Sequence, residues 1–132
     1  MGRKRYPPDD PREWLNRARS NLTLAENLIP DVFLEDLCFD AQQAAEKAIK
    51  AVFISRGEAF PYIHALEKLL RQLEQNGVKI PKYVWDAEKL SEFAVVTRYP
   101  GSVGPVTKRK YRRSVRIATA VLRWAERQVG RK

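Results

Sequence analysis

Apolar residues recur every three or four positions along this chain, a spacing that places them on one face of an α-helix. Asp10 and Pro11 predict the start of a first helix that ends near Pro30, because Asp caps helices and Pro suits the first helical position. The inward-facing residues of this helix are predicted to be Leu15, Ala18, Leu22, Ala25 and Ile29.

Two further helices are predicted from the next apolar runs. The second has Asp31 as its cap and ends at Gly57, because glycine readily adopts the positive φ of a helix end. Its apolar positions are Leu34, Leu37, Cys38, Ala41, Ala45, Ala48, Ile49, Val52 and Phe53. The third is shorter and spans residues 62–76, with Ile63, Leu66, Leu69, Leu70 and Leu73 facing inward.

The remaining sequence predicts a fourth and a fifth helix. Pro81 begins the fourth helix, and Pro100 with Gly101 ends it. Thr107 caps the fifth and longest helix, whose apolar positions are Tyr111, Val115, Ala118, Leu122, Ala125 and Val129. No segment alternates as a half-buried β-strand does, except residues 95–97, which lie inside a helical pattern.

These elements predict an all-α fold, an up-and-down bundle of four long helices plus one shorter helix. We expect residues 10–132 to form a single domain and residues 1–9 to form a flexible arm rich in basic residues and proline. The chain has 132 residues, of which 44% are hydrophobic, and this is enough apolar material for one core.

The composition also limits which kinds of protein and which kinds of site the sequence can represent. No apolar run approaches the roughly 20 residues that cross a bilayer, and no apolar signal segment follows the first residues, so we expect a soluble cytoplasmic protein. Cys38 is the only cysteine and is expected to be a small buried residue. With one histidine, His64, and no Gly-rich phosphate loop, the sequence predicts no metal, no cofactor and no assigned catalytic residue.

Positive charge is concentrated at the C-terminal end. The formal net charge is +9, yet residues 1–97 hold 14 basic and 15 acidic side chains, while residues 98–132 hold 11 basic side chains and one acidic side chain, Glu126. Such an asymmetry indicates attraction to phosphate groups or to an acidic partner protein. The alternative is a solvated helix face with no partner.

The first turn of the fifth helix is the candidate binding site. Three cations lie there, although each opposes the helix dipole at a cost of about 0.3 to 1 kcal/mol at low salt. A helix selected only for stability would carry acidic residues at this position, so we interpret the cations as an anion site. The candidate phosphate-binding residues are Arg98, Lys108, Arg109, Lys110, Arg112 and Arg113, with Tyr99 for stacking.

Several segments together resemble one known family. A Gln-Gln-Ala-x-Glu-Lys block lies within residues 39–51, Arg56 and His64 follow, and Arg-Tyr-Pro stands at residues 98–100. In these segments, over residues 10–130, the chain resembles the HEPN domain family, whose name denotes nucleotide binding in higher eukaryotes and prokaryotes. The resemblance implies a helical bundle, a homodimer, nucleotide or RNA binding, and a minimal nucleotidyltransferase partner, as in toxin–antitoxin pairs.

The resemblance also draws attention to polar residues on and after the second helix. Candidate supports of a ligand cleft are Gln43, Glu46, Lys47, Lys50 and His64. Glu46 and Lys50 are four positions apart, so they either pair with each other or support the cleft. Gln43 either supports the cleft or satisfies a buried amide between helices.

The chain departs from the family pattern in one respect. Many relatives are metal-independent ribonucleases in which a histidine follows an arginine after four to six intervening residues, but after Arg98 these positions hold Val103, Gly104 and Pro105. Because that histidine would transfer the proton during attack by the 2′-hydroxyl, we predict binding without cleavage. The alternatives are a ribonuclease toxin that uses His64 or Tyr111 instead, and a protein-interaction module that docks an acidic partner.

Overall fold

The protein is described by a computed structural model over residues 3–94 and 104–130. Within these residues there are helices and no strand, which confirms the predicted all-α helical bundle. The elements are α1 (Pro11–Glu26), α2 (Leu34–Ser55), α3 (Leu66–Gln75), α4 (Lys82–Trp85), the 3₁₀ helix η1 (Asp86–Phe93) and α5 (Lys108–Gly130).

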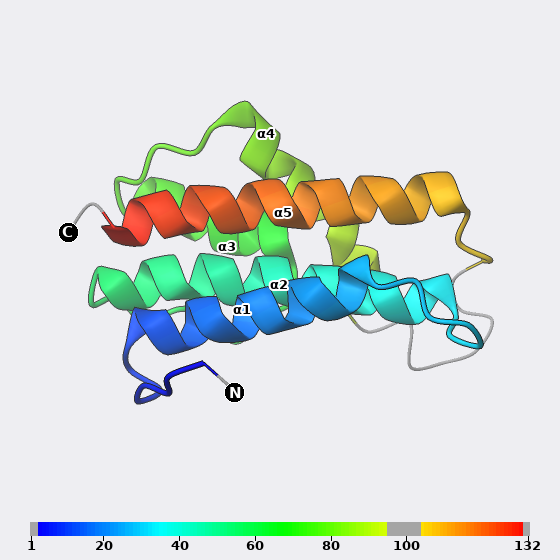
Figure 1. Ribbon diagram of the computed structural model, residues 1–132. Helices are drawn as coiled ribbons and strands as arrows, with labels where there is room; N and C mark the ends of the chain where they lie inside the picture. The colour runs from blue at the N-terminus through cyan, green and yellow to red at the C-terminus, as the bar shows by residue number, and fades with distance from the viewer. Residues whose placement is uncertain (1–2, 95–103, 131–132) are drawn as a thin grey trace.

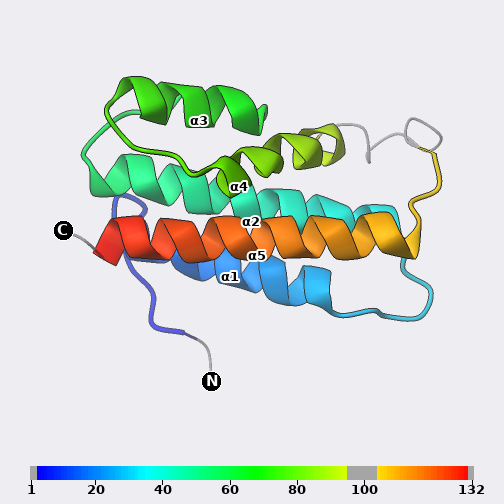
Figure 2. The ribbon, with the colours of Figure 1, turned by 90° about the horizontal axis from the view of Figure 1, so that it is seen from above.

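Helix α2 lies at the centre of the bundle. Helices α1 and α5 run lengthwise beside it (Figure 1), and α3 and η1 cover another side (Figure 2). Of the 22 residues of α2, 14 are buried. Many of these are alanines, whose small side chains let neighbouring helices approach closely. Fully buried Phe53, Phe93 and Trp124 fill much of the remaining core.

The first helix begins as predicted but ends early. The Asp10 side chain accepts a hydrogen bond from the Arg12 backbone N–H at 2.9 Å, and Pro11 occupies the first turn. The helix ends at Glu26 because the Asn27 side chain donates to the Thr23 carbonyl at 2.6 Å, which satisfies a carbonyl of the last turn. The prediction that Ile29 faces inward is therefore wrong, since it is 49% exposed.

The two ends of α2 differ in how well they were predicted. Gly57 adopts a φ of 69° just past the helix, as predicted. Asp31 is not the cap, because it adopts a φ of 68° in the preceding turn and the cap position is held by Phe33, without a side-chain hydrogen bond. Cys38 lies fully buried in this helix, and burial raises the pKa of its thiol, which confirms a packing role.

Helix α3 begins four residues later than predicted. The Ile63 N–H bonds to the Pro61 carbonyl at 2.9 Å, and the Leu66 N–H bonds to the Ser91 hydroxyl at 3.0 Å. These partners replace the helical hydrogen bonds that the prediction assumed. Ile63 and His64 therefore lie in the loop that precedes α3.

The fourth segment has two parts, and the fifth helix matches its prediction. A single α-helical turn, α4, follows Pro81 and continues into η1; the predicted end at Pro100 lies outside the described residues. Helix α5 begins at Lys108, where the Thr107 hydroxyl accepts from the Lys110 N–H at 3.1 Å. None of the described helices is both long and apolar enough to cross a membrane.

Candidate functional site

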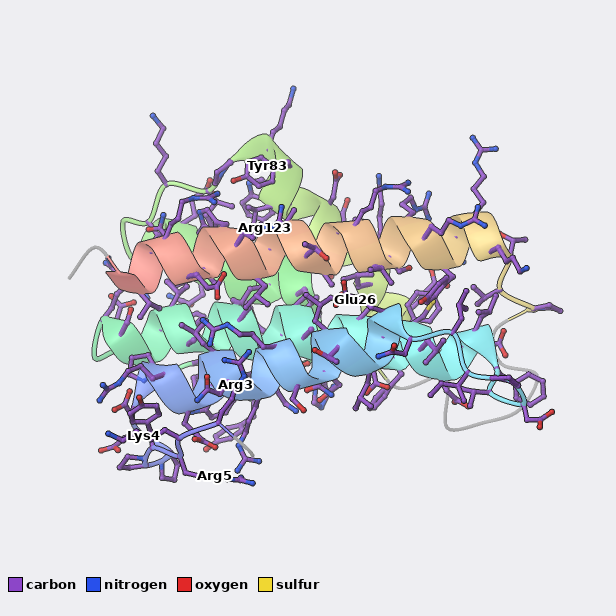
Figure 3. All side chains as sticks on the ribbon, viewed as in Figure 1. Arg3, Lys4, Arg5, Glu26, Tyr83 and Arg123 are labelled. Carbon is purple, nitrogen blue, oxygen red and sulfur yellow. The ribbon has the colours of Figure 1, made fainter. Side chains whose placement is uncertain are left out.

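Helix α5 carries arginines along its solvent face. Tyr111, Trp124 and the other buried residues form the opposite face. The exposed arginines, called the arginine row below, are Arg109, Arg112, Arg113, Arg116, Arg123 and Arg127. At 1.5 Å of rise per residue the row extends for about 27 Å. Figure 3 labels Arg123, which projects from α5 away from α1.

Most of this positive charge has no counter-charge among the described residues. Glu126 is the one acidic residue of α5, and it pairs with Arg19 of α1. Arg127 donates to the Tyr83 hydroxyl at 2.8 Å, and Lys110 pairs with Glu92 at 2.8 Å. In the part of the chain that the structure describes, no carboxylate pairs with Lys108, Arg109, Arg112, Arg113, Arg116 or Arg123.

A surface pocket adjoins the arginine row where α5 meets the end of α1. It has a volume of about 330 Å³ and is lined by Arg112, Arg116, Glu26 and Tyr111, among others. The Tyr111 hydroxyl forms a hydrogen bond to the Ala25 carbonyl, and burial raises the pKa of this phenol. The pocket therefore offers cations at its edge, while the tyrosine proton is already donated to the backbone.

The predicted support residues form a second polar cluster, centred on Glu46 of α2. One carboxylate oxygen of Glu46 accepts from Lys50 Nζ at 2.8 Å, and the other accepts from Gln42 Nε2 at 2.8 Å. His64 Nδ1 lies 3.0 Å from Glu46 Oε1. Gln43 joins the cluster by donating to the Gln42 side chain at 2.7 Å. The cluster is therefore a continuous hydrogen-bond network.

Glu46 is held as a carboxylate inside the protein. Its side chain is only 7% exposed, and burial acts to raise its pKa. The hydrogen bonds from Lys50, His64 and Gln42 outweigh burial, so the pKa of Glu46 lies below its ordinary value. The ionised Glu46 contacts the Nδ1 edge of the His64 ring, and the His64 side chain is 57% exposed.

Lys47 belongs to a different contact. It donates to the Asn21 side chain at 2.7 Å, and Asn21 in turn donates to Asp40 at 3.1 Å. Burial lowers the pKa of Lys47, and the nearby Arg17 charge adds to this effect. Four of the five predicted support residues thus belong to the hydrogen-bond network around Glu46, Gln43 through Gln42, whereas Lys47 links α2 to α1.

The predicted binding residues are not all brought together. Lys108, Arg109, Lys110, Arg112 and Arg113 share the start of α5, and Arg98 and Tyr99 lie outside the described residues. No hydrogen bond or ion pair among residues 3–94 and 104–130 links the start of α5 to the Glu46 cluster.

The Glu46–His64 contact was not predicted from the sequence, because no local spacing indicates a pair 18 positions apart. Within the same ranges no group of three or more His, Cys, Asp or Glu could hold a metal ion.

Comparison with known proteins identifies the family. The model of the HEPN domain family matches residues 11–128. The chain belongs to the HEPN domain family. The crystal structure of TT1696 from Thermus thermophilus is 30% identical in sequence and superposes with a TM-score of 0.79, covering 89% of this chain and 97% of that chain.

A second solved structure supports the same fold. The archaeal HEPN homologue ST0689 is 24% identical and has a TM-score of 0.73, covering 91% of this chain and 98% of that chain. At this identity the similarity shows the fold alone. No curated protein matches the sequence.

Proposed function

We propose that this HEPN domain binds the phosphate groups of a nucleotide or an RNA on the solvent face of α5, without cleaving its ligand. The observation that carries this proposal is the arginine row, whose charge is largely uncompensated by the described residues. Guanidinium groups suit phosphates because they donate two parallel hydrogen bonds. A bound polyanion would also relieve the repulsion between neighbouring cations of the row.

The start of α5 supplies the proposed primary contacts. Arg109 and Arg113 are exposed, lie four positions apart, and share one face of the helix. In our proposal they contact phosphates, while Lys108 and Arg112 on the neighbouring flank of the helix add to the attraction of the ligand. Arg98 and Tyr99 are proposed to add a phosphate contact and a stacking surface, and Lys110 to contribute charge although it also pairs with Glu92.

The absence of cleavage is proposed from the groups near the row. Gly104 and Pro105 offer no side chain that transfers a proton. The Tyr111 hydroxyl is engaged with the Ala25 carbonyl. Among the described residues at this end of α5, positive charge is therefore present without the histidine that would transfer the proton during attack by a 2′-hydroxyl.

A salt titration tests the binding proposal. We expect the logarithm of the affinity for a single-stranded RNA oligonucleotide to fall linearly with the logarithm of the salt concentration. Replacing both Arg109 and Arg113 by Ala should reduce the slope by about one unit for each phosphate contact that is lost. The matched control replaces exposed Lys68 and Lys79 by Ala, which removes the same charge elsewhere. Salt-independent binding, or the same loss of slope in the control, would contradict the proposal.

A ribonuclease is the second candidate function, and the Glu46–His64 contact favours it. Glu46 orients the imidazole from one side and leaves much of the ring exposed, an arrangement compatible with proton transfer. This candidate predicts metal-independent RNA cleavage that is lost in His64→Ala. Our proposal predicts no cleavage by the unmodified protein during long incubation with a chelator.

We further propose that the protein is a homodimer that acts with a minimal nucleotidyltransferase partner, as its family implies. Exposed apolar side chains in the last turn of α1 and in the loop before α2 support an interface: Leu24, Leu28, Ile29, Val32 and Phe33. Light scattering should give the mass of a dimer, and Phe33→Asp should shift it toward the monomer. Co-purification with an acidic protein, together with no RNA retention at low salt, would instead select the protein-docking alternative.

A further inference from the structure

A second basic region lies on the N-terminal arm, residues 3–9, which packs along α1. The Tyr6 N–H donates to Glu13 at 2.9 Å, the Trp14 indole donates to the Pro8 carbonyl at 2.7 Å, and Asn16 donates to the Lys4 carbonyl at 3.1 Å. Three hydrogen bonds therefore join the arm to one helix. They place its basic residues beside α1.

Residues of the arm and of α1 together line a groove. It has a volume of about 520 Å³, and five cations line it: Arg3, Lys4, Arg5, Arg17 and Arg19. Figure 3 labels the three cations of the arm, which lie beside the first half of α1. Glu13 is the one carboxylate that lines the groove. The groove is therefore strongly positive.

The one carboxylate that lines the groove already has partners. Glu13 accepts from the Tyr6 N–H and from Arg17 Nε at 2.7 Å, and these two hydrogen bonds lower its pKa. Arg19 is paired with Glu126. Within the described ranges no carboxylate pairs with Arg3, Lys4 or Arg5. Folding the arm onto α1 thus concentrates positive charge that the protein does not neutralise.

We propose that this groove is a second anion site, which binds a ligand with two or more adjacent phosphate groups. Arg17 and Arg19 of α1, which are held in place by their carboxylate partners, line the groove together with Arg3, Lys4 and Arg5 of the arm. The hydroxyls of Ser20 and Thr23 also line the groove and supply hydrogen-bond donors. Adjacent phosphates match closely spaced cations better than a single charge does. The ligand is either a free oligophosphate or a nucleic-acid backbone.

The site is separate from the start of the arginine row. The Arg19–Glu126 pair places the groove beside the C-terminal part of α5. Arg109 lies 17 residues earlier in the same helix, which corresponds to about 25 Å along its axis. The second site therefore does not depend on the proposed function of the start of α5.

A site-resolved titration tests this inference. Sodium tripolyphosphate is added to ¹⁵N-labelled full-length protein, and the amides of residues 16–23 and the Trp14 indole N–H are followed by NMR. We expect saturable shifts in these signals. Replacing Arg3, Lys4 and Arg5 together by Gln should weaken this binding at least about tenfold. The control replaces exposed Lys68, Lys79 and Lys82 by Gln and should change it less than about threefold.

The outcomes separate the two proposals and the two ligand sources. The same titration is carried out on the Arg109→Ala, Arg113→Ala double variant. Tripolyphosphate-induced shifts of the amide signals of residues 16–23 in this variant support the arm site, whether or not the start of α5 binds phosphates. Shifts of the same signals by an RNA oligonucleotide identify a nucleic-acid backbone as the source, and shifts by tripolyphosphate alone identify a free oligophosphate. No saturable shift with either probe, or equal weakening in the control variant, would overturn the inference.

Discussion

The solvent face of α5 and the polar face of α2 carry charged residues at the same helical spacing, but they use them differently. On α2, Glu46 and Lys50 are buried and bonded to each other, to Gln42 and to His64. On α5, Arg109 and Arg113 face solvent without a carboxylate partner among the described residues. The sequence spacing of charged side chains therefore does not show which of them stabilise the fold. Their hydrogen-bond and ion-pair partners do, and side chains without such partners are available to a ligand.

Removing the carboxylate of Glu46 should give the largest effect. Glu46→Ala leaves Lys50 buried without its counter-charge, and we expect a loss of about 3 to 5 kcal/mol in the free energy of unfolding. Urea denaturation followed by circular dichroism measures it. The control is Glu88→Ala, an exposed carboxylate on η1, which should cost less than about 0.5 kcal/mol. Equal effects in the two variants would show that the buried carboxylate of Glu46 contributes no more to stability than an exposed one.

Lowering the pH should remove the stabilisation of the folded state by Glu46 without a mutation. The folded-state pKa of Glu46 is lowered, so the unfolded chain binds the proton more tightly. The stabilisation by Glu46 is therefore complete above its ordinary pKa of 4.5 and is lost as the pH falls through the lower folded-state pKa. The stability difference between the unmodified protein and Glu46→Gln should shrink over this range. A difference that stays constant from pH 7 to pH 3 would contradict the assignment.

Tyr111 tests how the buried side of α5 is anchored. Its hydroxyl bonds to the Ala25 carbonyl, so Tyr111→Phe should cost about 1 kcal/mol in thermal or urea unfolding. Tyr83→Phe removes a hydroxyl that bonds exposed Arg127 and should be nearly neutral. A neutral Tyr111→Phe would indicate that the Tyr111–Ala25 hydrogen bond does not stabilise the α1–α5 contact.

Removing a cation from the start of α5 should have the smallest effect on stability, and the opposite sign. Arg109 lies in the first turn, where positive charge opposes the helix dipole. Arg109→Ala should therefore raise the free energy of unfolding by about 0.3 to 1 kcal/mol at low salt, and by less at high salt. Destabilisation by this variant would mean that Arg109 serves the fold.

The elements predicted correctly are those governed by neighbouring residues. Helix α5 has an unbroken apolar period and a capping threonine, so its start at Lys108 followed from the sequence. The start of α3 did not, because the Leu66 N–H finds its partner in Ser91, 25 positions away. In the candidate site, the cations could be identified from the sequence. The pairing of Lys110 with Glu92 could not, because it depends on how η1 packs against α5.

The central claim is that the uncompensated charge of the arginine row binds phosphates. Its most direct test is the dissociation constant for an RNA oligonucleotide at a fixed salt concentration of about 0.1 M, measured for the Arg109→Ala, Arg113→Ala variant and for the Lys68→Ala, Lys79→Ala control. We predict at least about tenfold weaker binding in the first and less than about twofold in the second. Equal weakening in both variants, or none in either, would contradict the claim.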